Sequence, residues 1–331
     1  MNVNNLLDVN DLEIVFSRRG RRDVRAVDKV SFSVAPGETV GLVGESGCGK
    51  SVTSLAIMGL LPKRGVRLGG SISFDGTELI GLPQDKLRRM RGRDLAMVFQ
   101  DPMTSLNPVI PIGTQVTEVL VRHRGLSGDA ARKEAADLLA RVGIPDPARR
   151  LKEYPHQLSG GMRQRALIAM ALAAKPRLLI ADEPTTALDV TIQAQILELL
   201  KELVRESGTA LIMITHDLGV VAGMCDSVHV MYSGRIVERA GRRELFGHPR
   251  HPYTGGLLAS IPRLDQPRGE RLEPIQGSPR DMLAWAEGCA FAPRCRNRVE
   301  ECVGTPPALG PDRLRPEHEL RCYNPLGGSN D

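Results

Sequence analysis

The stretch Gly44–Ser51, which reads Gly-Glu-Ser-Gly-Cys-Gly-Lys-Ser, decides the fold because it fits the phosphate-binding pattern G-x-x-x-x-G-K-[ST]. The apolar run Thr39–Val43 precedes it as a predicted strand, and a helical pattern follows from Lys50 to Met58. Glycines let the backbone of such a loop turn its N–H groups inward, towards phosphate oxygens, and the next helix adds its positive N-terminal dipole. The sequence therefore predicts a strand, a phosphate-binding loop and a helix, in that order.

Two side chains of this loop are expected to carry the chemistry. Lys50 is predicted to reach the β- and γ-phosphates of a nucleotide, and the Ser51 hydroxyl to bind Mg²⁺. Cys48 occupies a variable position of the pattern, where its backbone N–H matters more than its sulfur. The candidate nucleotide-binding residues of the loop are Gly44, Glu45, Ser46, Gly47, Cys48, Gly49, Lys50, Ser51 and Val52.

A second motif lies where the apolar run Leu178–Ala181 ends in two adjacent carboxylates, Asp182 and Glu183. Side chains alternate along a strand, so these two point in different directions. Two acids at the end of a buried strand are costly without a cation. We therefore predict that Asp182 holds Mg²⁺, directly or through water, and that Glu183 polarises the attacking water.

A third motif, Leu158–Arg165, reads Leu-Ser-Gly-Gly-Met-Arg-Gln-Arg and opens an amphipathic helix. Ser159 is the expected N-cap of that helix, whose first turn is a second potential anion site. Taken by itself, this motif indicates only a capped helix.

The 331 residues alternate strand-like and helical runs, which predicts an α/β fold with a parallel sheet covered on both faces. The predicted strands are Leu12–Phe16, Val30–Val34, Thr39–Val43, Ser71–Phe74, Ala96–Phe99, Leu178–Ala181, Ala210–Thr215 and Ser227–Met231. The predicted helices are Lys50–Met58, Gly113–Arg122, Asp129–Val142, Met162–Ala173, Thr191–Ser207 and Leu218–Met224. Residues 101–173 are mostly helical and interrupt the alternation, so an inserted helical subdomain is expected there.

Composition excludes several classes of protein. Hydrophobic residues make up 41% and charged residues 25%, which is typical of a globular chain, and the apolar runs fall short of the ~18 residues of a membrane span. The net charge of +5 suits a phosphate ligand or an anionic membrane face, whereas aromatic residues at 3% argue against nucleic acid as a partner. The cluster Arg18, Arg19, Arg21, Arg22 and Arg25 is interpreted as a solvated loop. The polar N-terminus lacks the layout of a signal peptide, which predicts a cytoplasmic location.

Together, the three motifs make the chain resemble the ATP-binding cassette (ABC) ATPases, a family of P-loop NTPases, over residues ~10–245. The resemblance implies a RecA-like core with a parallel sheet, an antiparallel β subdomain and the inserted helical subdomain. It also implies catalytic roles for Gln100, Glu183 and His216, and oxygen ligands for Mg²⁺ from Ser51, Gln100 and Asp182. Phe16 is the expected adenine-stacking residue, and Ala187-Leu188-Asp189 the D-loop. The signature residues Ser159, Gly160, Gly161 and Gln164 would close over the ATP held by a second cassette.

A finer resemblance is to the ATPases of oligopeptide/dipeptide importers. It rests on Asp101–Pro108 after Gln100, on Pro184–Thr191, and on His251-Pro252-Tyr253-Thr254 followed by Leu257–Pro262. The resemblance implies a peripheral subunit at the cytoplasmic face of the membrane. Its partners would be a second, distinct ATPase chain, two permease subunits and an extracytoplasmic solute-binding protein. Nickel, glutathione and sugars are alternative cargoes in this subfamily.

Composition changes near residue 246, and we predict a cassette domain over 1–245 and a loop-rich extension over 246–331. The extension holds 12 of the 23 prolines and four of the six cysteines: Cys289, Cys295, Cys302 and Cys322. Disulfides are disfavoured in the cytoplasm, and four cysteines in a segment with little core suggest a metal staple. No C-x2-C pair is present, which disfavours zinc, and members of the subfamily are known with a [4Fe–4S] cluster here. A [4Fe–4S] cluster is the leading expectation; zinc and free buried thiols are the alternatives.

Two other functions fit the motifs less well. A soluble ABC ATPase of DNA repair or translation usually carries two cassettes or a long coiled coil, and this chain has one cassette and no heptad run. A regulatory ATPase that only senses nucleotide would not need the intact Glu183 and His216.

Overall fold

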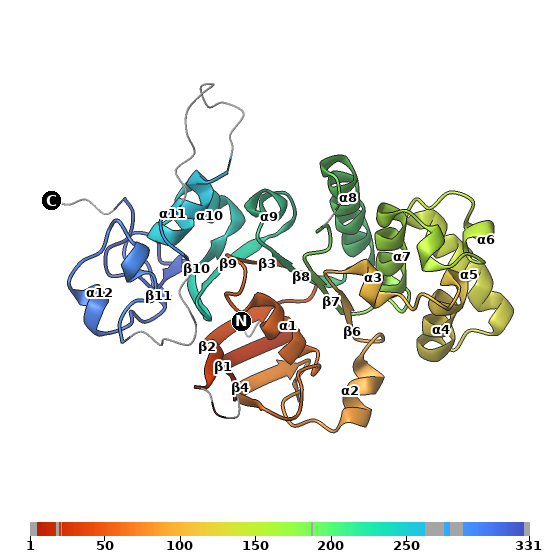
Figure 1. Cartoon of the computed structure of the whole chain (residues 1–331), viewed down its shortest axis with the longest axis horizontal. Helices are drawn as coiled ribbons and strands as arrows, with labels where there is room; N and C mark the ends of the chain where they lie inside the picture. The colour runs from red at the N-terminus through yellow and green to blue at the C-terminus, as the bar shows by residue number, and fades with distance from the viewer. Residues whose placement is uncertain are drawn as a thin grey trace. The chain divides into compact units, whose positions relative to one another are not determined.

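The computed structural model describes residues 5–17, 20, 22–186, 188–261, 275–278 and 287–327 (Figure 1). Arg18, Arg19, Arg21, Ala187 and Pro262, which the sequence analysis singled out, lie outside these residues. The chain divides into two compact units. The first unit comprises Met1–Leu6, Val34–Thr39 and Gly81–Met213, and the second comprises Leu7–Ser33, Val40–Ile80 and Ile214–Asp331.

The second unit contains a four-stranded sheet near its N-terminus. Its strands are β1 (Leu7–Phe16), β2 (Val24–Val34), β4 (Val66–Phe74) and β5 (Thr77–Glu78), in the order β2-β1-β4-β5. β1 runs antiparallel to β4, with Leu7 opposite Phe74 and Phe16 opposite Val66. The sequence predicted only the second half of β1, because the register shifts between Asn10 and Glu13 and this irregularity breaks the alternation.

The second unit also holds the strand that leads to the phosphate loop. β3 (Thr39–Val43) pairs in parallel with β9 (Ser227–Tyr232), and β9 turns back into the antiparallel β10 (Arg235–Gly241). The turn residues Ser233 and Gly234 both have positive φ, 47° and 79°. The prediction omitted β10, because its two arginines and its glutamate obscure the apolar pattern. The Ser233-Gly234 pair, which follows the apolar run of β9, is the sequence feature that could have predicted this hairpin.

Short elements follow β10 in the second unit: α10 (Arg242–Gly247), α11 (Pro252–Ala259), α12 (Glu301–Gly304), β11 (Gly310–Pro311) and β12 (Glu319–Leu320). β12 pairs with β10 and β11 with β12. Buried ionic groups support this pairing. Arg250 Nε donates to Asp312 Oδ2 at 2.8 Å, and His318 Nε2 lies 2.6 Å from Glu238 Oε1 on β10. The C-terminal segment, meaning the described residues after β10, is therefore fixed to the same sheet as β3 by its own strands, by the buried Arg250–Asp312 ion pair and by the His318–Glu238 contact.

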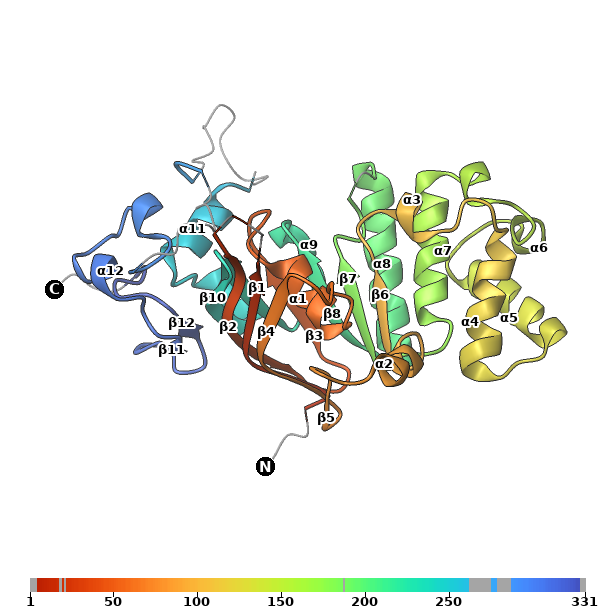
Figure 2. The same ribbon diagram turned by 60° about the horizontal axis from the view of Figure 1, so that its bottom comes forward.

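The first unit contains the strands β6 (Leu95–Val98) and β7 (Leu178–Asp182) and all but the last two residues of β8 (Ala210–Thr215). β7 lies between the other two strands, and β6 is parallel to β7. β7 and β8 are buried along their whole length, as predicted from their continuous apolar runs. The helices α7 (Gly160–Leu172) and α8 (Val190–Ser207) lie beside these strands (Figure 2). The predicted helices for these two segments began one or two residues later than the structure shows.

The remaining elements of the first unit are helical: α2 (Gln84–Met90), α3 (Pro102–Ser105), α4 (Ile112–Arg124), α5 (Gly128–Arg141), α6 (Pro147–Arg150) and the 3-10 turn η1 (Pro155–Gln157). Residues 101–173, all of them described, contain no strand. α4 begins after Pro111 and ends at Gly125, whose φ of 65° allows the αL cap. The sequence marks both ends of this helix.

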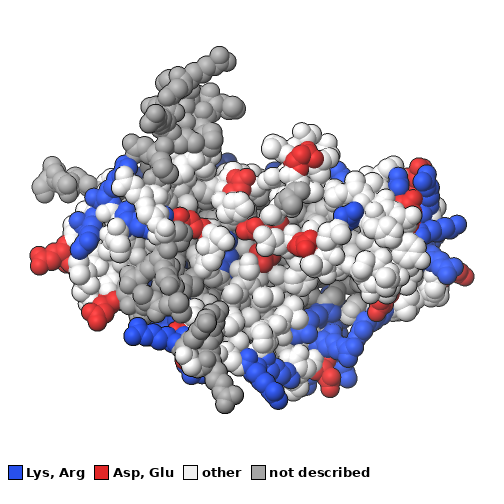
Figure 3. Space-filling model, viewed as in Figure 1, with Lys and Arg blue, Asp and Glu red and all other residues white. Residues whose placement is uncertain are grey.

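Within the described ranges, no helix is long and apolar enough to cross a bilayer. Uncharged residues make up most of the described surface on the face shown in Figure 3, and the charged side chains on it, of both signs, form separate groups. This pattern agrees with the small net charge of +5.

Candidate functional site

The phosphate loop lies in the second unit, between β3 and α1 (Lys50–Ile57), where the sequence placed it. The Lys50 side chain folds back over the loop: its Nζ donates to the carbonyls of Gly44 at 2.7 Å and Glu45 at 3.1 Å. Lys50 is only 5% exposed. A buried ammonium held at the centre of a glycine loop is a strong attractor for phosphate oxygens.

Two glycines of the loop cannot be replaced without moving backbone. Gly44 has φ 148° and Gly49 has φ 109°. A Cβ at Gly44 would lie 2.2 Å from the Met231 carbonyl oxygen, and one at Gly49 would lie 2.7 Å from the Ala26 carbonyl oxygen. Gly47 also has positive φ, 78°, but open space surrounds it. Only Gly44 and Gly49 are therefore constrained by both conformation and packing.

This difference gives a first prediction. Gly44→Ala is expected to lower the free energy of unfolding by several kcal/mol, because a strained φ costs ~1–3 kcal/mol and the clash with Met231 adds to it. The matched change Gly47→Ala carries the conformational cost alone, ~1–2 kcal/mol. Chemical denaturation of both variants measures the difference. Equal losses of unfolding free energy in the two variants would show that the close contact between Gly44 and the Met231 carbonyl does not constrain the loop.

The other residues of the loop differ in burial and in their contacts. Cys48 is buried, and burial raises the pKa of its thiol, so the side chain stays neutral. Its backbone carbonyl accepts from the Gly234 amide at 2.9 Å, which ties the loop to the β9–β10 turn. Ser51 and Val52 lie half-buried in the first turn of α1.

Two predicted site residues outside the loop also belong to the second unit. Phe16 is half-buried at the end of β1, and His216 is exposed directly after β8.

The adjacent carboxylates lie in the first unit, at the end of β7. Asp182 is the last residue of the strand and is 5% exposed. Glu183 has φ 46°, a strained value for a residue with a side chain. Its Oε2 accepts from Gln100 Nε2 at 2.8 Å and from the Thr186 hydroxyl at 3.0 Å. The structure thus brings together Gln100 and Glu183, which are 83 residues apart in the chain.

The serine-glycine motif also lies in the first unit, at the start of α7. The Ser159 hydroxyl caps this helix by accepting from the Met162 amide at 3.3 Å. A Cβ at Gly161 would lie 2.8 Å from Ile192 Cγ2 on α8. The Asp189 side chain caps α8 by accepting from the Ile192 amide at 3.0 Å. The first turns of α7 and α8 are therefore in contact. Gly161, predicted as a signature residue, packs against Ile192 of α8, the helix that Asp189 caps.

Four cysteines of the C-terminal segment lie near one another. The Cys289 amide donates to the Cys302 carbonyl at 2.8 Å. Burial raises the pKa values of the Cys289, Cys295 and Cys322 thiols, that of Cys322 to about 12, and the neighbouring cysteines add to each increase. Without a cation, these thiols stay protonated at neutral pH.

The predicted four-cysteine metal centre is nevertheless not supported by the structure. Among the residues that the structure describes, no group of three or more His, Cys, Asp or Glu side chains is placed to hold a metal ion. All four cysteines belong to the described residues and are free. The four cysteines lie in the second unit without forming such a group.

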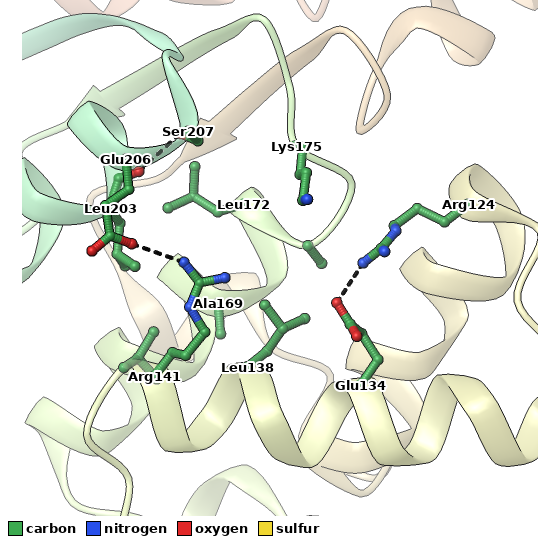
Figure 4. A pocket seen from close by; sticks show the side chains of 12 residues that line it. Arg124, Glu134, Leu138, Arg141, Ala169, Leu172, Lys175, Leu203, Glu206 and Ser207 are labelled. Carbon is green, nitrogen blue, oxygen red and sulfur yellow. Dashed lines mark hydrogen bonds and ion pairs between the residues drawn. The ribbon is translucent and has the colours of Figure 1, made fainter.

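The first unit also has a pocket of about 220 Å³, between α5, α7 and α8 (Figure 4). Its charged lining forms two ion pairs, Arg124 with Glu134 at 2.5 Å and Arg141 with Glu206 at 3.0 Å. None of the motif residues lines it. Because its main charges neutralise each other, we assign no ligand to this pocket.

Family models and known proteins match this chain over most of its length. Residues 27–186 match the family model described as ABC transporter, and residues 237–302 match the model described as oligopeptide/dipeptide transporter, C-terminal region. The chain is 52% identical to the oligopeptide transport ATP-binding protein OppD of Salmonella typhimurium, over 98% of this chain and 95% of that protein. It is also 52% identical to the dipeptide transport ATP-binding protein DppD of Bacillus subtilis, over 96% and 91%.

A solved structure agrees with the sequence relatives. The dimeric post-hydrolysis state of the ATP-binding cassette MJ0796, bound to ADP and Pi, resembles this chain with a TM-score of 0.64 and 29% identity. The match covers 72% of this chain and 99% of that one. The fold is therefore the ABC ATPase cassette, with a further C-terminal segment. From its motifs, its fold and the identity with relatives over nearly its whole length, the chain belongs to the ABC transporter family, among the ATP-binding proteins of the oligopeptide/dipeptide branch.

Proposed function

We propose that this chain is the ATP-hydrolysing subunit of an ABC importer for dipeptides and oligopeptides. The observation that carries the proposal is the phosphate loop with its buried Lys50, in a chain 52% identical to oligopeptide and dipeptide transport ATP-binding proteins. The cargo would pass through other subunits, and this chain would supply the energy of ATP hydrolysis.

The proposed site follows the motifs along the chain. ATP lies on the loop Gly44–Val52, with Lys50 on its β- and γ-phosphates and Phe16 against the adenine. The Ser51 hydroxyl, Gln100 and Asp182 would hold Mg²⁺, which would supply positive charge to neutralise the phosphates. Two arguments support these three ligands: the resemblance to the ABC ATPases, and the fact that all three side chains supply oxygen, which Mg²⁺ prefers.

Catalysis is assigned to side chains around Glu183. Its carboxylate accepts a proton from the attacking water, and Gln100 holds that carboxylate in place through their 2.8 Å hydrogen bond. His216 is proposed to contact the γ-phosphate. Ser159, Gly160, Gly161 and Gln164, with Asp189 of the D-loop, would act on the ATP of a second cassette. The contact between the first turns of α7 and α8 supports a joint role for these two motifs.

We further propose the assembly in which this motor works. A cassette domain over 1–245 would pair with a second, distinct ATPase chain and dock on two permease subunits at the cytoplasmic face of the membrane. A solute-binding protein would deliver the cargo from the other side. The names of the relatives support this assembly, because both describe transport ATP-binding proteins.

Uptake of a labelled dipeptide tests the cargo. Cells that lack this chain are expected to lose uptake and to regain it when the natural chain is restored. Excess unlabelled dipeptide should compete with the label, whereas nickel, glutathione and sugars should not. Competition by one of these three instead would replace the peptide assignment, while leaving the ATPase assignment intact.

We also propose that Cys289, Cys295, Cys302 and Cys322 bind a [4Fe–4S] cluster, which would staple the extension 246–331. Their proximity supports this, since the Cys289 amide donates to the Cys302 carbonyl at 2.8 Å. A cluster would also offset the small core of this proline-rich segment.

The metal content of anaerobically purified protein checks the cluster. We expect roughly four irons and four sulfides per chain, lost in Cys302→Ser and kept in Cys225→Ser, whose thiol is buried between α9 (Leu218–Met224) and β9. Zinc in place of iron, or no metal at all, would contradict the cluster.

A further inference from the structure

The C-terminal segment makes direct contact with the phosphate loop. The backbone amide of Glu45, the second residue of the loop, donates to the Tyr253 hydroxyl at 2.9 Å. Tyr253 is fully buried and stands in α11, 208 residues further along the chain. His251 caps the same helix by accepting from the Tyr253 amide at 3.0 Å. The His-Pro-Tyr stretch therefore places a fixed hydroxyl against the loop.

A second contact of the same loop residue is ionic. Arg294 Nη1 donates to Glu45 Oε2 at 2.7 Å, and Arg294 Nη2 donates to Glu45 Oε1 at 3.0 Å. This is the two-pronged geometry in which a guanidinium matches a carboxylate best. The Arg294 side chain is 6% exposed and that of Glu45 is 24% exposed, so solvent screens the pair little.

The three other N–H groups of the Arg294 guanidinium are also used. Nε donates to the Gln276 carbonyl at 2.9 Å and Nη2 to the Gly277 carbonyl at 3.2 Å. Nη1 donates to the Tyr232 hydroxyl at 3.4 Å. A guanidinium has five N–H donors, and here each has an acceptor. Lysine has three donors on one nitrogen, so it cannot replace this set.

Aromatic rings hold the guanidinium in place. Tyr232, Tyr253 and Phe291 pack against one another with centroid distances of 4.7–5.3 Å. The Arg294 guanidinium carbon lies 5.9 Å from the Tyr232 ring centroid and 6.0 Å from that of Phe291. The position of the Arg294 side chain is thus fixed by the rings of Tyr232 on β9 and Phe291, and Tyr253 of α11 packs against both rings.

The charge of Glu45 explains why the loop would need this arrangement. A carboxylate in a loop that binds a triphosphate repels the ligand, and the repulsion grows with the ligand's charge. The guanidinium neutralises that carboxylate and, with Tyr253, fixes the loop backbone before nucleotide arrives. Pre-ordering a loop removes an entropic cost from binding.

We propose that Arg294 is a positioning and charge-compensating residue of the phosphate loop, so that the C-terminal segment forms part of the nucleotide site. This inference rests on the proposed function of the loop as an ATP site. Arg294 acts through Glu45 and Tyr232, and no contact between Arg294 and ATP is required.

The test is nucleotide binding by the full-length chain, with Mg·ATP and Mg·ADP as the probes. Arg294→Ala is expected to raise the Kd for ATP by about ten-fold, the size of one lost charged hydrogen-bond pair, and the Kd for ADP by less, because ADP carries less charge. Arg294→Lys should fall in between. Arg298→Ala removes the same charge from an exposed position four residues later and should change neither Kd.

A double variant separates charge compensation from a merely structural role. If Arg294 works by neutralising Glu45, then Glu45→Gln in the Arg294→Ala background should restore most of the ATP affinity. An unchanged Kd in Arg294→Ala, equal weakening of ATP and ADP, or no recovery in the double variant would overturn the proposal. Failure of the natural chain to bind ATP would instead contradict the proposed function of the loop.

Discussion

Glu183→Gln is expected to reduce ATP turnover by about 10²–10⁴-fold while leaving ATP affinity close to that of the natural chain. The amide has the shape of the carboxylate, and its oxygen can still accept from Gln100 and from Thr186, so the local structure should persist. What disappears is the ability to take a proton from water. A cassette that binds ATP without hydrolysing it should also stay paired with its partner cassette, because hydrolysis is what reopens the pair.

Phosphate release and ATP binding, measured on the same preparation, check this result. Glu198→Gln is the matched control, because it makes the same change on an exposed residue of α8. Hydrolysis at the natural rate in Glu183→Gln would remove Glu183 from its assigned role. A loss of binding together with turnover would point to a structural role instead.

Lys50→Ala is expected to weaken ATP binding by about ten- to a hundred-fold. The ammonium is the buried cation of the loop, and removal of a charged hydrogen-bond donor costs ~1.5–3 kcal/mol. In the structure, Lys50 Nζ also satisfies the Gly44 and Glu45 carbonyls, so some loss of stability should accompany the loss of affinity.

Equilibrium titration with Mg·ATP measures the change, with Lys63→Ala as the control at an exposed lysine of the same unit. The Lys63 variant should bind as the natural chain does. Unchanged affinity in Lys50→Ala would count against the assignment of the loop to phosphate.

The parts of the fold that could be predicted from sequence are those with a local cause. The phosphate loop is bounded by a short apolar strand and by a helix that begins at Lys50, and the structure has both at the expected residues. β7 and β8 were predicted because central parallel strands need continuous apolar runs. The family resemblance was confirmed by relatives over nearly the full length.

The parts that could not be predicted depend on distant residues. β10 is stabilised by pairing with β9 and β12, not by its own apolar pattern. Arg294 binds Glu45, 249 residues away in the chain. Nothing in the positions of Glu45 and Arg294 along the sequence indicates that these two side chains form an ion pair.

The most direct test of the central claim measures whether peptide transport and ATP hydrolysis are coupled through this chain. The assembled transporter, purified through this chain and placed in lipid vesicles, is supplied with its solute-binding protein and a dipeptide while phosphate release is followed. The account predicts that the dipeptide raises the rate of ATP hydrolysis, and that the rise is lost with Lys50→Ala and kept with Lys63→Ala. A rate that does not respond to dipeptide, or that responds equally in the Lys50→Ala assembly, would contradict it.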